Sequence, residues 1–390
     1  MRIAHIITRM IIGGAQENTL YNCEDLISLF GDEVRLITGP SLGPEGELLG
    51  QGRGGVQVPV QIVPTLRRSI NPWRDTASYF ALKRAIHAFR PDVVHTHSAK
   101  GGFLGRLAAW SLGVPAVVHT VHGAPFHAYQ SAPARSLFRW CERYAARRCH
   151  ALISVADAMI DLMVNASVAP REKFTTIYSG MDVEPFLHAD IHRAAMRSLL
   201  GYEPQHIVIG KIARLFHLKG HSDVIQAAAE VVKANSNVRF LLIGDGVLRE
   251  QLQKQIDDEG LSQHFCFEGL VPPSEIPRYF GAMDILVHAS LREGLARALP
   301  QALIAGKPVV SYDIDGAREV AINGQTGFLV PPQWKELVQP LVTLAADCQL
   351  RSRLGLAGRE RFTEQFRHEF MTRKIRELYE RVLCERRKRA

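Results

Sequence analysis

Short apolar runs alternate with longer amphipathic stretches along most of the chain. The runs in the first half are RIAHIIT, EVRLIT, VQIVP, DVVHT, AVVHT and ALISV. After about residue 185 the pattern restarts with HIVIGKIA, VRFLLIG, FCFEG, DILVHAS, PVVSY and FLV. Nearly continuous apolar strands separated by helices are typical of parallel sheets covered on both faces. Two such series predict an α/β protein with two doubly wound domains.

The change between the two series places the domain boundary. It falls in SGMDVEPF, 179–186, which a polar helical segment follows. The predicted domains are therefore residues 1–185 and 186–365. The last stretch is helical and charged and has no strand partner, so we expect residues 366–390 to form a helix that packs back across the domains.

Composition narrows the class of protein. With 46% hydrophobic residues, the 390-residue chain can bury two cores. No apolar run approaches the ~20 residues of a membrane helix, and the start, MRIAHIIT, lacks the apolar segment and cleavage site of a signal peptide. The six cysteines are scattered without a C-x-x-C pair. We therefore expect a reduced, cytoplasmic protein.

Basic residues are concentrated in one region. Residues 1–52 carry a net charge of −4, whereas residues 53–148 carry fourteen Lys and Arg against three Asp and Glu, a net charge of +11. Such a region suits an anionic partner, such as a membrane surface or a phosphorylated substrate, or it is simply a solubilising surface. No nucleic-acid motif accompanies it, so no nucleic-acid partner is expected.

One helix in this region could contact a membrane. Four arginines at successive i+4 spacings share one of its faces, and an apolar face lies beside them. A basic amphipathic helix can lie on an anionic membrane surface. The alternative is a surface helix whose apolar face packs into the core. The arginines are Arg135, Arg139, Arg143 and Arg147.

Two turns beyond predicted strands could bind phosphate, because ligands of open parallel sheets bind beyond the carboxyl ends of the strands. Gly13 and Gly14 would let the backbone approach a phosphate at a helix start, or they form a plain tight turn. Arg214 and Lys219 precede another predicted helix. They could clamp a diphosphate, or they are solvated loop cations.

Two further loops carry weaker patterns. G-D-G at 244–246 lacks the third glycine of a dinucleotide fingerprint, which argues against NAD. The D-x-D of YDID, 312–315, could bind a metal and a diphosphate, but we prefer a loop with solvated or capping aspartates.

Histidines cluster in the first predicted domain. His95 and His97 are alternate residues at a strand end and would face one way, which raises the hypothesis of a metal hydrolase. His122 lies in a turn beyond the next strand. It could donate to an oxygen, act as a base, or be satisfied by local backbone.

The segment SLREGLARALPQALIAGKPVV, 290–310, places an acid beside a helix start. Pro300 is tolerated only in a first helical turn, so the helix is expected to begin near Arg297. Glu293 then lies in the preceding turn and Gln301 in the first turns. Free amides there suit a phosphate, with polar groups holding hydroxyls. Alternatively, Glu293 only meets the helix dipole.

Together these turns resemble the retaining glycosyltransferases of family 4, which have the GT-B fold. The resemblance runs over nearly the whole chain. It implies two Rossmann-like domains facing each other across a cleft, with the nucleotide-sugar bound by the second domain and the acceptor mostly by the first. The matching pieces are IIGGAQ, DVVHTHS, HTVHG, YSGMD, IARLFHLKG, LLIGDG, FEGLV, EGLARALPQALIAGKPVV, DGAREV and TGFLV.

The resemblance also assigns residues to the diphosphate and the reaction centre. It implies that Arg214 and Lys219 bind the donor diphosphate. It implies that Gly13 and Gly14 approach that diphosphate from the other domain. It places His122 at the reaction centre near the sugar.

The acid motif of the family supplies the remaining donor contacts. Glu293 is the first acid of the family's E-x7-E motif and would contact the transferred sugar. The backbone of Gly294, Leu295 and Ala296 would meet sugar and phosphate. Val271 would meet the base.

The second acid of that motif is replaced here by Gln301. In the family this acid is assigned to the ribose hydroxyls. Glutamine can still accept and donate hydrogen bonds, but it loses the charge-assisted bond of a carboxylate. We therefore expect weaker or altered nucleotide binding rather than a dead enzyme.

The predicted activity is transfer of a sugar from a nucleoside-diphosphate sugar to an acceptor hydroxyl with retained configuration. Cations and helix amides would stabilise the leaving diphosphate, so neither a metal nor a cofactor is expected to be required. UDP is favoured over GDP. The expected acceptor is a cell-envelope, lipid-linked or exopolysaccharide glycan, and the expected position is the cytoplasm or the cytoplasmic membrane face. The alternative is a non-catalytic protein that binds a nucleotide-sugar or glycan.

Overall fold

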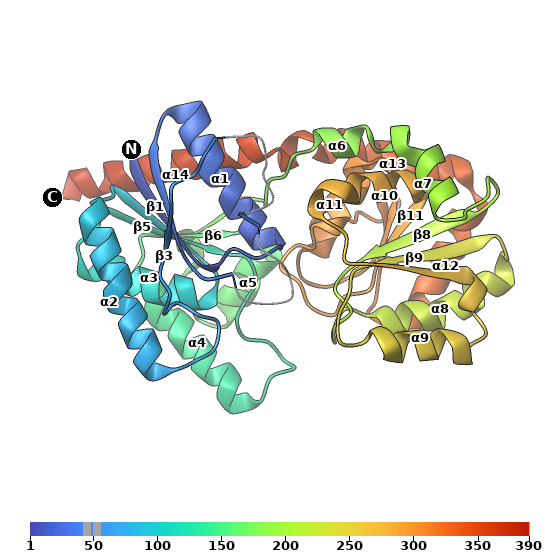
Figure 1. The fold of residues 1–390 in the computed structure, drawn as a ribbon, viewed down its shortest axis with the longest axis horizontal. Helices are drawn as coiled ribbons and strands as arrows, with labels where there is room; N and C mark the ends of the chain where they lie inside the picture. The colour runs from blue at the N-terminus through green and yellow to red at the C-terminus, as the bar shows by residue number, and fades with distance from the viewer. Residues whose placement is uncertain (42–47, 50–55, 390) are drawn as a thin grey trace. The chain divides into compact units, whose positions relative to one another are not determined.

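The computed structural model describes residues 1–41, 48, 49 and 56–389, and the chain forms two compact units. The N-terminal unit consists of Met1–Met181 together with Gln365–Ala390, and the C-terminal unit is Asp182–Glu364. The chain therefore leaves the first unit four residues before the predicted boundary and returns to it near its end. Figure 1 shows the elements of each unit.

Among the described residues, the N-terminal unit contains a seven-stranded parallel sheet in the order β3-β2-β1-β4-β5-β6-β7. Six strands match predicted apolar runs. The short β7, FTT, carries too little apolar sequence to be predicted. The strands are β1 (Arg2–Arg9), β2 (Glu33–Gly39), β3 (Val60–Ile62), β4 (Val93–His97), β5 (Ala116–Val121), β6 (Ala151–Ser154) and β7 (Phe174–Thr176).

Helices cover both faces of this sheet. Helix α14 packs beside α1, and its Tyr379 and Met371 join a buried cluster with Ile3 and Val118 of the sheet (Figure 1). Helices α2 and α3 pack together on the other side. The helices are α1 (Gly14–Phe30), α2 (Pro72–Phe89), α3 (Ala99–Ser111), α4 (Ala132–Ala146), α5 (Asp157–Asn165) and α14 (His368–Arg389).

The C-terminal unit contains a six-stranded parallel sheet in the order β10-β9-β8-β11-β12-β13. All six strands overlap the predicted runs of the second series. They are β8 (Ile207–Ile212), β9 (Val238–Ile243), β10 (Phe265–Gly269), β11 (Ile285–His288), β12 (Val309–Tyr312) and β13 (Gly327–Val330).

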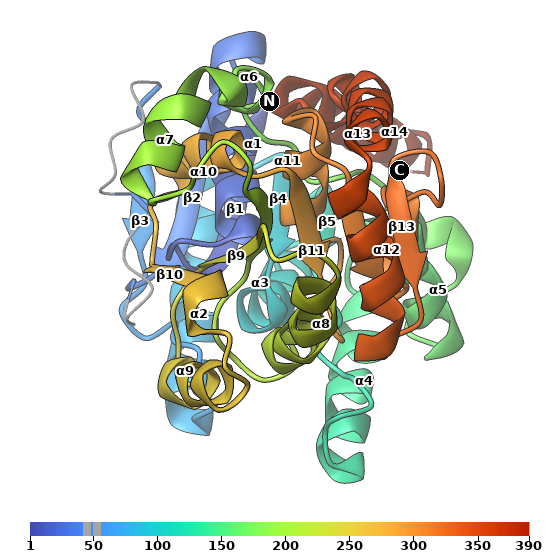
Figure 2. The ribbon, with the colours of Figure 1, turned by 90° about the vertical axis from the view of Figure 1, so that its right-hand side faces the viewer.

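Helices α8 and α12 lie side by side against this sheet (Figure 2), where Val224 and Leu337 join Ile285 in a buried core. Helix α11 begins at Ala298, which confirms the start expected from Pro300. No described helix is both long and apolar enough to cross a membrane. The helices are α6 (Glu184–Leu187), α7 (Arg193–Leu199), α8 (His221–Ala234), α9 (Arg249–Asp258), α10 (Ile276–Ala282), α11 (Ala298–Ile304), α12 (Trp334–Ala346) and α13 (Cys348–Phe362).

Candidate functional site

The candidate donor site lies where the strand order of the C-terminal sheet reverses, between β8 and β11. Ligands of open α/β sheets bind beyond the strand ends at such a reversal. Lys219 follows β8 and Glu293 follows β11. Their side chains form an ion pair and are only 19% and 22% exposed. The strand order thus brings together two predicted site residues that are 74 positions apart.

Backbone contacts fix the loop that carries Lys219. The Leu291 amide donates to the Leu218 carbonyl over 2.8 Å, which joins the loops after β11 and β8. Gly220 has a φ of 65°, and a Cβ there would lie 1.8 Å from the Ala289 carbonyl oxygen. Only glycine fits this contact, because other residues would add both the clash and backbone strain.

The G-D-G turn supports the loop that carries Arg214. The Leu215 amide donates to the Asp245 carbonyl over 3.0 Å. Gly244 has a φ of 133°, and a Cβ there would lie 2.2 Å from the Ala213 carbonyl oxygen. This turn, which lacks the third glycine of a dinucleotide fingerprint, therefore packs directly against the loop of the exposed Arg214.

The loop of Glu293 is held by the segment that follows β12. The Glu293 amide donates to Asp315 Oδ2 over 2.7 Å, and the Gly316 amide donates to the Gly294 carbonyl over 3.0 Å. Asp315 of YDID therefore holds a loop amide rather than capping a helix, and it is neither of the solvated or capping aspartates expected there. The residue that it holds could not be read from the sequence.

The electrostatic surroundings keep Glu293 ionised. Burial alone would raise the pKa of the Glu293 carboxyl, but Lys219 brings that pKa below its usual value. His288 Nε2 lies 3.8 Å from the carboxylate, and burial lowers the pKa of His288 to about 3. Near neutral pH, Glu293 is thus a carboxylate whose cationic partner is Lys219.

A buried lysine lies near this pair. Lys211 of β8 is fully buried and its Nζ has no hydrogen-bond partner among the described residues. Burial and the neighbouring charge of Lys219 lower the pKa of Lys211 to about 7, although Glu293 acts against them. Nothing in the sequence singles out Lys211, because it stands within an apolar run that predicts only a strand.

The other predicted donor contacts lie at the same edge of the sheet. Gly294, Leu295 and Ala296 form the turn between β11 and α11, with Gly294 buried. Gln301 is half-buried in the first turn of α11. Val271 lies just beyond β10, two strands away from β8, and is partly exposed.

In the N-terminal unit, the predicted residues follow strands next to another reversal, between β1 and β4. Gly13 precedes α1, and Gly14 is its first residue. The φ of Gly13 is 170°, which any residue can adopt, and a Cβ there would meet only the flexible end of Gln16. The backbone therefore does not require glycine at 13. His122 follows β5, one strand further along.

The rings of His5, His97 and His122 are joined in a row by hydrogen bonds, and we call this row the histidine file. His5 Nδ1 lies 3.0 Å from His97 Nε2, and His97 Nδ1 lies 3.1 Å from His122 Nε2. His5 and His97 are fully buried. The sequence alone does not single out His5, because its position beside β4 follows only from the pairing of β1 with β4.

The metal hypothesis meets a competing explanation in the same cluster. Ligand atoms of His5, His95 and His97 lie within 4.8 Å of one another. However, His95 Nδ1 lies 2.6 Å from the Tyr379 hydroxyl and His95 Nε2 lies 2.7 Å from Thr120 Oγ1. Hydrogen bonds thus occupy both nitrogens of His95 and of His97, and a metal ion would have to displace them.

Helix α4 does not bury its apolar face as an ordinary surface helix does. Arg139 and Arg143 donate to the Ala166 carbonyl over 3.2 and 3.1 Å. Leu137 and Trp140, on the apolar side, are 54% and 56% exposed. Part of the arginine face therefore packs against the protein, while the apolar face meets solvent.

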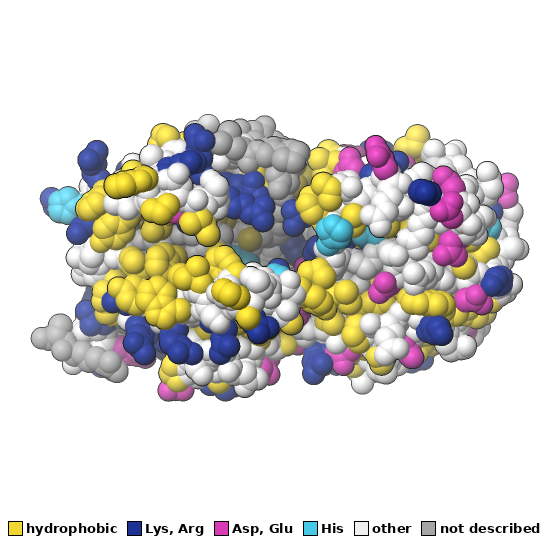
Figure 3. Space-filling model, turned by 90° about the horizontal axis from the view of Figure 1, so that it is seen from below, with side chains coloured by type: hydrophobic (Ala, Val, Ile, Leu, Met, Phe, Trp, Pro, Cys, Tyr) yellow, Lys and Arg dark blue, Asp and Glu magenta, His cyan; other side chains and the backbone are white. Residues whose placement is uncertain are grey.

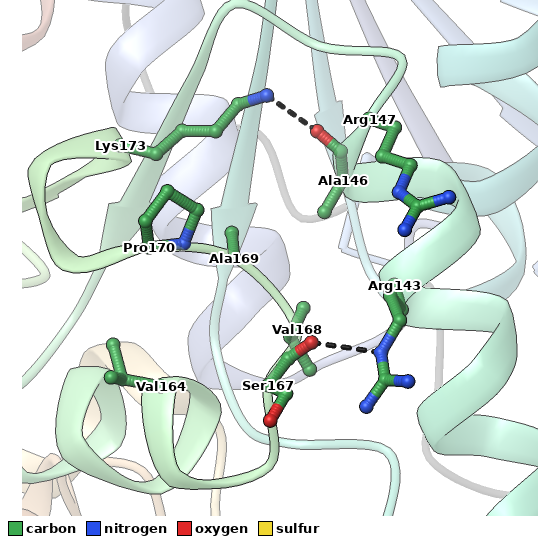
Figure 4. Close-up of a pocket in the computed structure, with 9 residues that line it drawn as sticks. All are labelled: Arg143, Ala146, Arg147, Val164, Ser167, Val168, Ala169, Pro170 and Lys173. Carbon is green, nitrogen blue, oxygen red and sulfur yellow. Dashed lines mark hydrogen bonds between the residues drawn. The ribbon is translucent and has the colours of Figure 1, made fainter.

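A basic cavity of about 420 Å³ lies at the C-terminal end of α4 (Figure 4). Lys173 donates to the Ala146 carbonyl over 2.6 Å, and Arg143 donates to the Ser167 carbonyl over 2.8 Å. These cations satisfy carbonyls at the last residue of α4 and just after the end of α5. Both helices lead into the starts of strands, so the cavity lies at the amino ends of the strands, whereas His122 lies at the carboxyl end of β5.

Comparison with known families defines the class. The model described as Glycosyl transferase 4-like domain matches residues 13–180, and the model described as Glycosyl transferases group 1 matches residues 195–361. Together they span most of the chain. The chain belongs to the family-4 type of GT-B glycosyltransferases, which confirms the predicted family, fold and nucleotide-sugar transferase activity.

Individual relatives agree with this class. The UDP-Gal:alpha-D-GlcNAc-diphosphoundecaprenol alpha-1,3-galactosyltransferase of Escherichia coli is 29% identical over 333 residues, covering 85% of this chain and 84% of the relative. Alpha-D-kanosaminyltransferase of Streptomyces kanamyceticus is 28% identical over 275 residues, covering 67% and 70%. The structure of Anabaena HepE in complex with UDP matches with a TM-score of 0.80 at 23% identity, covering 97% of this chain and 99% of that one.

Proposed function

We propose that this enzyme transfers a sugar from a UDP-sugar to an acceptor hydroxyl, with retained configuration and without a metal. The observation that carries the proposal is the Lys219–Glu293 pair, which joins a cation at the strand reversal to the acid that we assign to the sugar. A UDP-sugar is supported by the names of the Escherichia coli relative and of the Anabaena HepE complexes with UDP and UDP-glucose. The acceptor in this proposal is a lipid-linked or other cell-envelope glycan.

The ion pair suggests how the donor is received. When the donor binds, Lys219 contacts the diphosphate and Glu293 contacts hydroxyls of the sugar. Each side chain thus exchanges its ion-pair partner for a group of the donor. Arg214, exposed near the start of the same β8–α8 loop, adds a second cation to the diphosphate. Two cations at the leaving group stabilise the charge that develops there, the contribution that a metal would otherwise make.

The remaining predicted residues complete this proposal. The backbone of Gly294, Leu295 and Ala296 contacts sugar and phosphate, while Val271 contacts the base. Gln301 binds the ribose. Gly13 and Gly14 approach the diphosphate and His122 acts at the sugar, all from the N-terminal unit. The acceptor hydroxyl attacks the sugar from the same face that the phosphate leaves, and the leaving phosphate takes the proton of that hydroxyl.

The decisive experiment measures release of nucleoside diphosphate from UDP-sugars, with and without acceptor. Glu293→Gln should abolish most release while the protein stays folded, because the amide loses the charge that meets the sugar. Glu319→Gln, another acid of this unit, provides the control. Wild-type rates for Glu293→Gln would remove the central residue of the proposal.

A non-catalytic binding protein is the second candidate, and Gln301 favours it. A wild-type protein that binds a UDP-sugar in a thermal-shift assay, yet releases no diphosphate with any acceptor, would establish that alternative. Turnover of any UDP-sugar would exclude it.

We further propose that the N-terminal unit rests on an anionic membrane. Large apolar side chains are exposed on α2 to α4 and just before α2, and Figure 3 shows hydrophobic side chains over this unit bordered by Lys and Arg. Residues 53–55 of the predicted basic region lie outside the described residues. Apolar insertion with surrounding cations is the combination that holds proteins at anionic interfaces. The exposed residues are Ile70, Trp73, Phe80, Trp110, Leu137 and Trp140.

Pelleting with anionic vesicles tests this surface. Trp73, 87% exposed, is the first target, and Trp73→Ser should weaken binding several-fold. Ile191, 74% exposed on the C-terminal unit, provides the matched control Ile191→Ser. Equal binding by the two variants, or preferential binding of DNA over vesicles, would contradict the proposal.

A further inference from the structure

The histidine file links the candidate reaction centre to the interior of the N-terminal sheet. Its rings stack at 15° between His5 and His97 and at 29° between His97 and His122. The inner two rings are fully buried, so only His122 is placed to meet a substrate. The inner rings can act only through His122: they determine which of its ring nitrogens carries the hydrogen and how the ring is oriented.

A neutral imidazole carries one N–H donor and one bare acceptor nitrogen. Burial lowers the pKa of His5 to about 3 and that of His97 well below its usual value, so both are neutral. The hydrogens of the file must therefore all point the same way. If they point outward, His122 accepts at Nε2 and carries its hydrogen on Nδ1. If they point inward, His122 carries its hydrogen on Nε2.

The inner end of the file selects between these two states. His5 Nε2 is buried and has no hydrogen-bond partner among the described residues. The inward state would leave an N–H donor there, whereas the outward state leaves a bare nitrogen. Among backbone groups, orphaned buried N–H donors are rarer than unfilled acceptors, and we apply the same preference to the ring nitrogen of His5. The outward state is therefore favoured.

We propose that His97 and His5 are positioning residues that hold His122 with its hydrogen on Nδ1, so that His122 donates a hydrogen bond at the transferred sugar. This inference rests on the proposed function, in which His122 acts at that sugar. It decides between the two roles open for His122, donor and base, in favour of the donor. The proton of the acceptor hydroxyl then goes to the leaving phosphate, as proposed above.

The direct test is ¹⁵N NMR of the protein labelled on its histidine rings, with His122 assigned through His122→Gln. We expect the wild type to show the hydrogen of His122 on Nδ1. In His97→Leu, which removes both bonds of the middle ring, that preference should be lost. A wild-type spectrum with the hydrogen on Nε2 overturns the inference without any variant of the file.

Kinetics separate positioning from folding. By analogy with the hydrogen-bonded partners of metal-binding histidines, His97→Leu should lower kcat roughly 10- to 100-fold with little change in the donor KM. His97→Gln, which can still bond to His122, should recover part of that loss. His95→Leu is the matched control: its bonds lead to Tyr379 and Thr120, so it should lose stability but keep kcat per folded molecule.

Two outcomes distinguish this inference from the proposed function. Wild-type kcat in His122→Gln would remove His122 from the reaction and overturn this inference, while transfer from the UDP-sugar, which is tested by Glu293→Gln, would stand. A slow His122→Gln together with a fully active His97→Leu would overturn only the role of the file. If His97→Leu does not fold, the wild-type ¹⁵N spectrum alone still decides the inference, because it shows whether the hydrogen of His122 is on Nδ1 or on Nε2.

Discussion

Replacing Gly220 by alanine tests whether the packing of two loops sets the position of Lys219. With a φ of 65°, an alanine there costs about 1–2 kcal/mol of backbone strain. Its Cβ would also lie 1.8 Å from the Ala289 carbonyl oxygen. Carbon and carbonyl oxygen normally approach to about 3.3 Å, so the loops must separate by roughly 1.5 Å. Displacements near 1 Å can cost about 100-fold in rate.

The matched control is Gly260→Ala. Gly260 has a φ of 69°, but a Cβ there meets nothing within 4 Å. The control should lose about 1 kcal/mol of unfolding free energy and keep its activity. Gly220→Ala should lose more than the control and should lower kcat/KM for the donor about 100-fold.

Both quantities are measurable on the purified protein. Urea unfolding gives the free energies, and release of nucleoside diphosphate at varied UDP-sugar concentration gives kcat/KM. If Gly220→Ala matched Gly260→Ala in stability and in donor kinetics, the loop contact would not position Lys219, and the reasoning would be refuted.

Three further predictions concern charge. Lys219→Met should lower kcat/KM for the donor by at least tenfold in the same release assay, because the diphosphate loses a cation; wild-type kinetics would contradict its place there. Gln301→Glu should change the donor Kd measured by calorimetry, and an unchanged Kd would place Gln301 away from the nucleotide. Burial lowers the pKa of His5 to about 3 in the folded state, against about 6.5 when unfolded, so only the unfolded state binds this proton in between. Stability should therefore fall as the pH drops from about 6.5, by about 1.4 kcal/mol per pH unit for this residue. Urea unfolding at pH 7 and pH 5.5 measures the fall, and His5→Leu should show a shallower one.

Most of the fold was predictable because its signals are local. A buried parallel strand must be apolar along its length, which marks β1 and β8 equally well. Pro300 marks the start of α11, because proline fits only the first turn of a helix. The strand β7 could not be predicted in this way, because FTT is short and largely polar. It is recognised only by its pairing with β6.

The site was predictable as separate residues but not as an arrangement. Lys219 and Glu293 each follow a predicted strand, yet their pairing depends on the strand order. Asp315 and His5 act through partners that adjoin them only in the folded sheet. Helix α4 shows the same limit, since amphipathicity does not reveal which face packs inward.

The return of α14 to the N-terminal unit has a consequence for synthesis of the protein. The C-terminal unit is one continuous segment and can close as soon as its last strand and helices have left the ribosome. The N-terminal unit lacks part of its core until the final helix emerges, because Tyr379 fills that core and bonds to His95. The half of the protein that is made first is therefore the half that is finished last.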